Sequence, residues 1–184
     1  MKSVCLALSL FLVVSEVLAG SVQAQVSFFQ PPSYAGVGNV FVADFNGDGK
    51  ADILVSDGTM NLGNGDGTFT PGINVSGGAL AVADFNGDGR PDVLQSGTGA
   101  LLVLLGNGDG TFQPAITTAN AAGLTEVAAV DLNGDGKADV VGMYSTFLFV
   151  YISNGDGTLQ ARSLLQRGYV WRIDPGRFQQ RWED

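Results

Sequence analysis

The sequence contains no histidine and only one cysteine, Cys5, among its 184 residues. Their absence argues against Ser-His-Asp and Cys-His catalytic arrangements and against most zinc sites. Basic residues are also scarce, with 9 Lys and Arg against 18 Asp and Glu and a formal net charge of −9. Phosphate binding needs clustered basic side chains, so we expect no nucleic-acid partner.

The N-terminal residues resemble an export signal, with an apolar run from Val4 to Val14 and small residues ending at Ala24. The run is too short to cross a bilayer, which argues against a membrane anchor, and a buried core strand is the other alternative. We predict that residues 1–24 are a signal peptide, that the protein is secreted to an extracellular or periplasmic space, and that it has no membrane span. Cleavage would remove Cys5, so a bound metal could supply the cross-link that a disulfide cannot.

A nine-residue loop of the form Asp-x-Asn-Gly-Asp-Gly-x-x-Asp occurs three times, at Asp44–Asp52, Asp84–Asp92 and Asp131–Asp139. The copies begin 40 and then 47 residues apart. Each is followed by a second loop, Asn-Gly-Asp-Gly-Thr-Phe or the same with leucine, beginning at Asn64, Asn107 and Asn154. Repeats of about this length are typical of propellers and solenoids.

Short apolar runs flank both loops of each repeat, and no segment after residue 25 shows a helical period with caps. Two loops per repeat therefore predict about four short antiparallel strands per repeat, which is the composition of a propeller blade. The predicted segments are a linker, three blades and a tail: 25–38, 39–78, 79–122, 123–165 and 166–184.

The two loops together resemble FG-GAP or VCBS-type repeats, the blades of the integrin α-chain N-terminal propeller and of many secreted proteins. The resemblance covers about residues 39–160. It implies an all-β fold, a partial β-propeller of three four-stranded antiparallel blades with calcium loops. It also implies a module that presents its loops to an extracellular protein or carbohydrate.

The residue types of the first loop match the ligands of Ca²⁺, a hard cation that takes about six to eight oxygen atoms. Positions 1, 3 and 5 offer side-chain oxygens, position 7 a backbone carbonyl, and position 9 a closing carboxylate. The candidate ligands at about three sites are Asp44, Asn46, Asp48, Lys50 and Asp52; Asp84, Asn86, Asp88, Arg90 and Asp92; and Asp131, Asn133, Asp135, Lys137 and Asp139.

An EF-hand is excluded because position 12, which needs a bidentate acid, is Val55, Gln95 or Gly142. A purely structural alternative is that the first loops are only Asn-Gly and Asp-Gly turns that bind no metal. Turn chemistry does not require aspartate at positions 1 and 9 of all three copies, and we therefore favour the calcium sites.

The second loop carries a single carboxylate in each copy, so we interpret it as a tight hairpin with positive φ angles. Its aspartates, Asp66, Asp109 and Asp156, are not counted as ligands. Phe69 and Phe112, which end two of these loops, are expected to pack in the core.

The repeat pattern departs from a closed propeller, which needs about four to eight blades. Three explanations stay open: an open wedge of three blades, self-association that completes a propeller, or a fragment of a longer protein. The first repeat is short, so a strand around Met60 to Leu62 should be weak. Residues 166–184 mix arginine with aromatic residues, and we expect a disordered or partly docked tail rather than a lipid or nucleic-acid site.

We predict a secreted, calcium-binding module for binding or adhesion, and not an enzyme. The alternatives are a calcium-stabilised accessory part of a secreted carbohydrate-active enzyme and a piece of a larger propeller. Outside the predicted signal peptide, the repeat loops and the tail, only Asp57 and Glu126 could provide a pair of free carboxylates for glycosidase-like chemistry.

Overall fold

The computed structural model describes residues 33–34, 36–119, 123–124, 126–160, 163–165, 170–174 and 177–181. The chain divides into two compact units, Met1–Ser33 and Tyr34–Asp184, and every described strand belongs to the second. The predicted signal peptide, residues 1–24, lies outside the described residues and stays a prediction.

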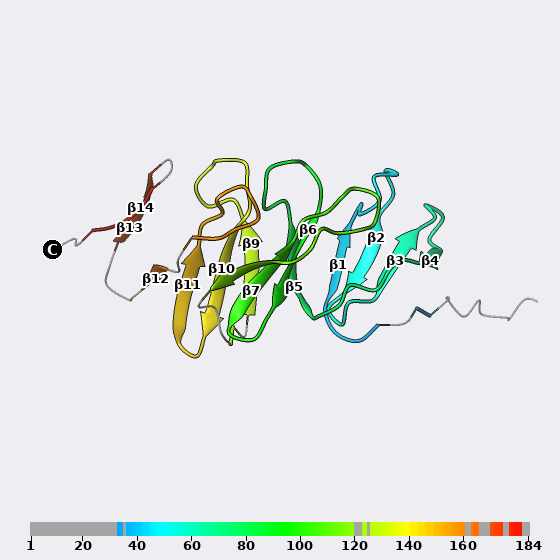
Figure 1. The fold of residues 1–184 in the computed structure, drawn as a ribbon, viewed down its shortest axis with the longest axis horizontal. Helices are drawn as coiled ribbons and strands as arrows, with labels where there is room; N and C mark the ends of the chain where they lie inside the picture. Colours follow the sequence, from blue (N-terminus) through cyan, green and yellow to red (C-terminus); the bar gives the residue numbers. More distant parts are fainter. Residues whose placement is uncertain are drawn as a thin grey trace, which may run out of the picture. The chain divides into compact units, whose positions relative to one another are not determined.

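Three four-stranded antiparallel sheets make up the body of the second unit (Figure 1). Blade 1 contains β1 (Val40–Ala43), β2 (Asp52–Val55), β3 (Met60–Gly63) and β4 (Phe69–Pro71). Blade 2 contains β5 (Ala79–Ala83), β6 (Asp92–Ser96), β7 (Ala100–Leu104) and β8 (Ile116–Ala119). Blade 3 contains β9 (Glu126–Val130), β10 (Asp139–Tyr144), β11 (Phe147–Tyr151) and β12 (Ser163–Leu165). Each sheet joins strands that follow one another in the sequence, which confirms the predicted all-β architecture of three antiparallel four-stranded units.

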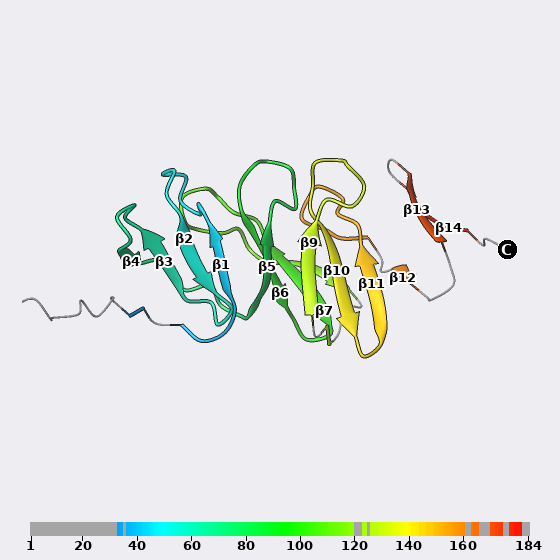
Figure 2. The same ribbon diagram turned by 180° about the vertical axis from the view of Figure 1, so that it is seen from behind.

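The blades pack against each other through apolar side chains. Blade 2 lies between the other two, and both of its faces are apolar. One core cluster joins blades 1 and 2 and includes Phe45, Leu54 and Val93. A second joins blades 2 and 3 and includes Phe85 and Val140. The first strands of neighbouring blades contact each other, β1 with β5 and β5 with β9 (Figure 2).

The weak strand expected in blade 1 forms, but its pairing is short. β3 pairs with β2 at two positions, Ile53–Asn61 and Leu54–Met60, whereas β6 and β7 pair at four. Met60 is nevertheless buried, so the short repeat reduces the ladder and not the core.

The C-terminal segment contains two more strands, β13 (Val170–Asp174) and β14 (Arg177–Arg181), paired as an antiparallel hairpin. We expected a disordered or partly docked tail and did not predict this pairing. The signal for it is the Pro-Gly dipeptide at positions 175–176 between the two runs, which is a strong turn signal.

The described residues form no helix, so this part of the chain contains no helix that is long and apolar enough to cross a membrane.

Candidate functional site

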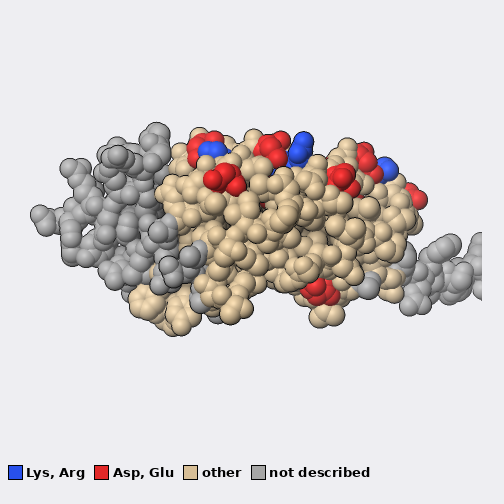
Figure 3. Space-filling view, in the orientation of Figure 1, with Lys and Arg blue, Asp and Glu red and all other residues tan. Residues whose placement is uncertain are grey.

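The two loops of each blade lie at the same end of its sheet, because the first loop joins strands one and two and the second loop follows strand three. In Figure 3 acidic and basic side chains gather along one edge of the face shown. Backbone angles explain the glycine content of these loops: Gly47 and Gly65, for example, have φ angles of 71° and 82°. Such angles favour glycine.

The first, third and fifth side chains of the first loop bind the backbone of the loop itself. Asp44 Oδ2 accepts a hydrogen bond from the amide of Gly49 at 2.8 Å, and Asn46 Oδ1 accepts one from Asp48 at 3.1 Å. Asp48 Oδ1 accepts from the amide of Lys50 at 2.9 Å. The same bonds recur in the other two copies.

The seventh residue, expected from the sequence to contribute only its backbone carbonyl, also contributes a cationic side chain. The Lys50 ammonium lies 3.2 Å from Asp48 Oδ2, and the Lys137 ammonium lies 3.0 Å from Asp135 Oδ2. Arg90 approaches Asp88 at 3.8 Å. The backbone amide of Lys50, together with its side chain, holds the pKa of Asp48 below its usual value, and the Lys137 side chain does the same for Asp135.

The ninth residue has a role that sequence reasoning missed. Asp52, Asp92 and Asp139 are fully buried, and each carboxylate accepts two backbone amides, one from the first loop and one from the end of the third strand. In blade 1, Asp52 Oδ2 accepts from Phe45 at 2.9 Å and Oδ1 accepts from Gly63 at 2.8 Å. The equivalent bonds are present in blades 2 and 3. The ninth aspartate therefore ties the first loop of its blade to the end of the third strand.

Burial has an electrostatic cost at these carboxylates, because it disfavours the charged form. It raises the pKa of Asp92 to about 6, against the opposing effect of the Gly106 and Phe85 amides. It also raises the pKa of Asp139.

The donor chemistry of the first loop fits a calcium ion, but the described arrangement is not that of a closed cage. Positions 1, 3 and 5 bring hard oxygen atoms into one loop, while position 9 lies buried behind it. Among the described residues, no three His, Cys, Asp or Glu side chains are grouped so that they could hold a metal ion. The carboxylates of the first loop accept hydrogen bonds from amides of the loop, and the fifth residue also forms an ion pair with the seventh.

The second loops form the predicted hairpins. In blade 1 the Asn64 amide donates to the Thr68 carbonyl at 2.9 Å, and the Thr68 amide donates to Asp66 Oδ1 at 2.9 Å. The Thr68 hydroxyl and amide together lower the pKa of Asp66. Phe112 packs edge-on against Phe45 of the neighbouring blade with ring centroids 6.1 Å apart, in agreement with a core role.

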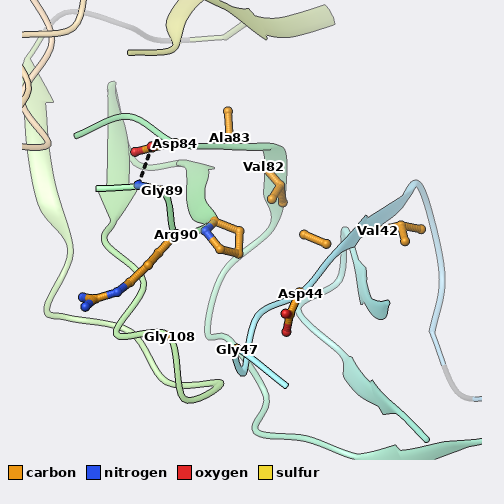
Figure 4. A pocket seen from close by; sticks show the side chains of 11 residues that line it. Val42, Asp44, Gly47, Val82, Ala83, Asp84, Gly89, Arg90 and Gly108 are labelled. Atoms are coloured by element: carbon orange, nitrogen blue, oxygen red, sulfur yellow. Dashed lines mark hydrogen bonds between the residues drawn. The ribbon is translucent and has the colours of Figure 1, made fainter. Parts of the chain in front are cut away.

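A pocket of about 430 Å³ lies at the junction of blades 1 and 2 (Figure 4). Its polar lining includes Asp44, Asp84 and Arg90, and its apolar lining includes Val82 and Pro91. Asp84 Oδ2 is held by the Gly89 amide at 2.7 Å, which fixes this carboxylate beside the pocket. No sequence signal could reveal the pocket, because its walls come from two different repeats.

Comparison with solved structures finds an Agrocybe aegerita lectin, whose structure concerns specific recognition of non-reducing terminal N-acetylglucosamine. The similarity has 32% sequence identity and a TM-score of 0.57, and it covers 70% of this chain and 38% of the lectin chain. The chain thus spans well under half the length of that relative. The Photorhabdus luminescens Tc holotoxin pore is also similar, with 21% identity, a TM-score of 0.47, and 76% of this chain and 8% of that chain covered. None of the curated proteins matches this sequence.

A family model, described as an FG-GAP-like repeat, matches residues 84–142. The match begins at the first loop of blade 2 and ends in β10 of blade 3. It confirms the resemblance seen in the loops: residues 84–142 of this chain match an FG-GAP-like repeat.

Proposed function

We propose that this chain is a non-catalytic binding or adhesion module for an extracellular carbohydrate, and that the pocket between blades 1 and 2 is where the sugar binds. The observation that carries this proposal is the pocket itself, whose lining brings the charged residues Asp44, Asp84 and Arg90 together with the apolar residues Val82 and Pro91. The similarity to a lectin supports carbohydrate over protein as the ligand.

The chemistry of the pocket suits a sugar. Carboxylates accept hydrogen bonds from hydroxyl groups, and the Arg90 guanidinium donates to ring or acetamido oxygens. Val82 and Pro91 offer apolar surface for the carbon-bound hydrogens of a pyranose ring. A volume of about 430 Å³ falls within the usual range of small-ligand sites.

Titration calorimetry with an oligosaccharide ending in N-acetylglucosamine tests the site. The full chain should bind, and Arg90→Met should weaken binding by about tenfold or more, since it removes a charged hydrogen-bond donor. Lys137→Met is the matched control, because it changes the equivalent residue of blade 3 outside this pocket. Equal affinities for the two variants would refute the pocket, and absence of binding to any glycan on an array would refute the carbohydrate ligand.

We further propose that the first loops bind calcium and that the ion stabilises the scaffold. Asp44, Asn46 and Asp48 and their counterparts would hold it, in exchange for the cation at position 7. A bound ion would offset the repulsion among the acids of each loop. A ligand that binds only the native state raises stability in proportion to the logarithm of its concentration.

Thermal melting of the full chain in chelator and in millimolar calcium tests this role, with a higher melting temperature expected in calcium. The variant Asp44→Ala/Asp84→Ala/Asp131→Ala should lose the calcium-dependent shift. The matched control, Asp66→Ala/Asp109→Ala/Asp156→Ala, removes acids that are also engaged in loop hydrogen bonds but are not candidate ligands, and should keep the shift. Identical melting with chelator and with calcium would count against the sites.

Export is the remaining part of the proposal and rests on residues 1–24. Expression of the full chain in a secreting host should yield protein whose N-terminal residue is Gln25. Protein retained in the cytoplasm with Met1 intact would contradict export.

Activity of the full chain on polysaccharides would favour the alternative in which the chain is an accessory part of a carbohydrate-active enzyme.

A further inference from the structure

We infer that two copies of this chain associate head to tail, with blade 3 of each copy packed against blade 1 of the other. Three blades from each copy would make a ring of six, within the range of about four to eight blades in which propellers close. This inference is independent of the carbohydrate ligand. It rests on the two blade interfaces already present within the chain.

Each internal interface uses the same two faces. We call the side of a blade that meets the following blade its leading face, and the side that meets the preceding blade its trailing face. The leading faces of blades 1 and 2 place Phe45 and Phe85 at equivalent positions, both almost fully buried. Leu54 and Leu94 are likewise equivalent and fully buried.

Blade 3 has the same leading face, and several of its side chains stay accessible, although Val150, at the position of Val103, is buried. Leu132 occupies the position of Phe85, and Val141 occupies that of Leu94, yet both are only half-buried. Val130, at the position of the half-buried Ala83, is 48% exposed. Blade 3 therefore has an apolar leading face. Blade 3 covers the leading face of blade 2, but no described blade covers that of blade 3 in the same way.

Blade 1 has the corresponding trailing face. Phe41 packs toward blade 2, and side chains alternate along a strand, so its neighbours Val40 and Val42 point the other way. These two valines are 58% and 64% exposed. Ile53 is half-buried, whereas its counterpart Val93 is fully buried against blade 1.

The second loop of blade 1 is open in the same direction. A Cβ at Gly157 would meet Ile116 of the preceding blade at 2.5 Å, and one at Gly110 would meet Asn46 at 3.7 Å. At the equivalent Gly67 no described atom lies within 4 Å of that place. At Gly110 and Gly157 the preceding blade fills this space. At Gly67 no described residue fills it.

Backbone hydrogen bonds across the internal interfaces show how the free faces would join. The Gly110 amide donates to the Phe45 carbonyl at 2.9 Å, and the Ala138 amide donates to the Asp84 carbonyl at 2.8 Å. In the proposed contact the equivalent donors are Gly67 and Ala51 of one copy. The equivalent acceptors are Leu132 and Asp131 of the other.

A second copy is the occupant that the observations favour, because one chain carries both halves of an interface that it already uses twice. Such a contact joins unlike surfaces, and it forms a closed ring only when the rotation between copies fits. Unrelated partners would have to reproduce both the apolar positions and the loop hydrogen bonds.

Light scattering after size exclusion, applied to the full chain over a range of concentrations, tests the association. A particle of about twice the 19.0 kDa of one chain is expected. Val130→Glu should shift it to the monomer, raising the dissociation constant by about tenfold or more, because a charge would be buried in the contact. The control Ile73→Glu changes a side chain of nearly equal exposure, 47%, in the β4–β5 connection and should leave the dimer intact.

Mixing two variants tests the direction of the contact. Val40→Glu damages the trailing face of blade 1 and Val130→Glu the leading face of blade 3, so each alone should be monomeric. An equal mixture should form mixed dimers, which contain one undamaged interface. A monomeric wild-type chain, an unaffected Val130→Glu dimer, a particle of three or more copies, or no dimer on mixing would each overturn the inference. Unchanged circular dichroism verifies that the variants are folded.

Discussion

At the scale of single residues, the ninth aspartate of each first loop has the clearest structural role. Its two oxygens satisfy two amides from the segments that flank the second strand, as Asp52 does for Phe45 and Gly63. An ionised carboxylate only accepts hydrogen bonds, whereas an asparagine amide would turn a donor toward one of these N–H groups. The choice of aspartate therefore follows from the two donors, whether or not a metal ion is bound.

Asp92→Asn should change how stability depends on pH. The pKa of Asp92 is raised from 3.8 to about 6, so the native state holds this proton more firmly than the unfolded chain. The stability gained from that proton is fully present below the unfolded value and is lost as the pH rises through 6. Urea unfolding in chelator should show the advantage of the wild type over Asp92→Asn shrinking by ~2.5 kcal/mol between pH 4 and pH 7.

Asp57→Asn is the control for this titration, because Asp57 is exposed and its pKa is lowered by amides of Thr59 and Val37. Stability from that group is present at neutral pH and is lost as the pH falls, which is the opposite sign. Parallel pH profiles for the wild type and Asp92→Asn would contradict the raised pKa.

At the scale of elements, the loops both close the strands of one blade and contact the next blade. Gly47 shows this double constraint, because its φ is 71° and a Cβ would lie 2.9 Å from the Gly108 carbonyl oxygen of blade 2. Gly49, two residues later, has a φ of 79° and no described atom within 4 Å of that place. Two glycines in one loop thus have the same backbone conformation in different surroundings.

Gly47→Ala should destabilise the protein more than Gly49→Ala. Both variants lose about 1 kcal/mol to the left-handed conformation, but only Gly47→Ala adds a clash with backbone, costing roughly 1–3 kcal/mol more. Urea unfolding of both variants measures the difference. Equal destabilisation would show that the first loop of blade 1 does not press against blade 2.

At the scale of the whole molecule, stability is shared between blades, because both core clusters draw on two neighbouring sheets. Arrays of this kind behave as chains of units coupled to their nearest neighbours. Phe85 belongs to blade 2 but packs with Val140 and Tyr151 of blade 3. Damage at such a position should therefore spread across the interface.

Phe85→Ala should lower the free energy of unfolding by roughly 3–5 kcal/mol. It should also speed hydrogen exchange of strand amides in blades 2 and 3 together. Phe147→Ala, which truncates a phenylalanine that is 47% exposed, should cost less than about 0.5 kcal/mol. Faster exchange confined to blade 2 would show that the blades unfold independently.

The sequence by itself determined the local features: three repeats, four short strands in each, and glycine-rich loops with positive φ angles. Turn chemistry and strand alternation act within a few residues, so they can be read along the chain. Tertiary structure alone decided that Asp92 is buried, that Asp44 and Arg90 line one pocket, and which faces of the end blades stay open. These features depend on segments far apart in sequence, whose packing and hydrogen bonds have no local signature.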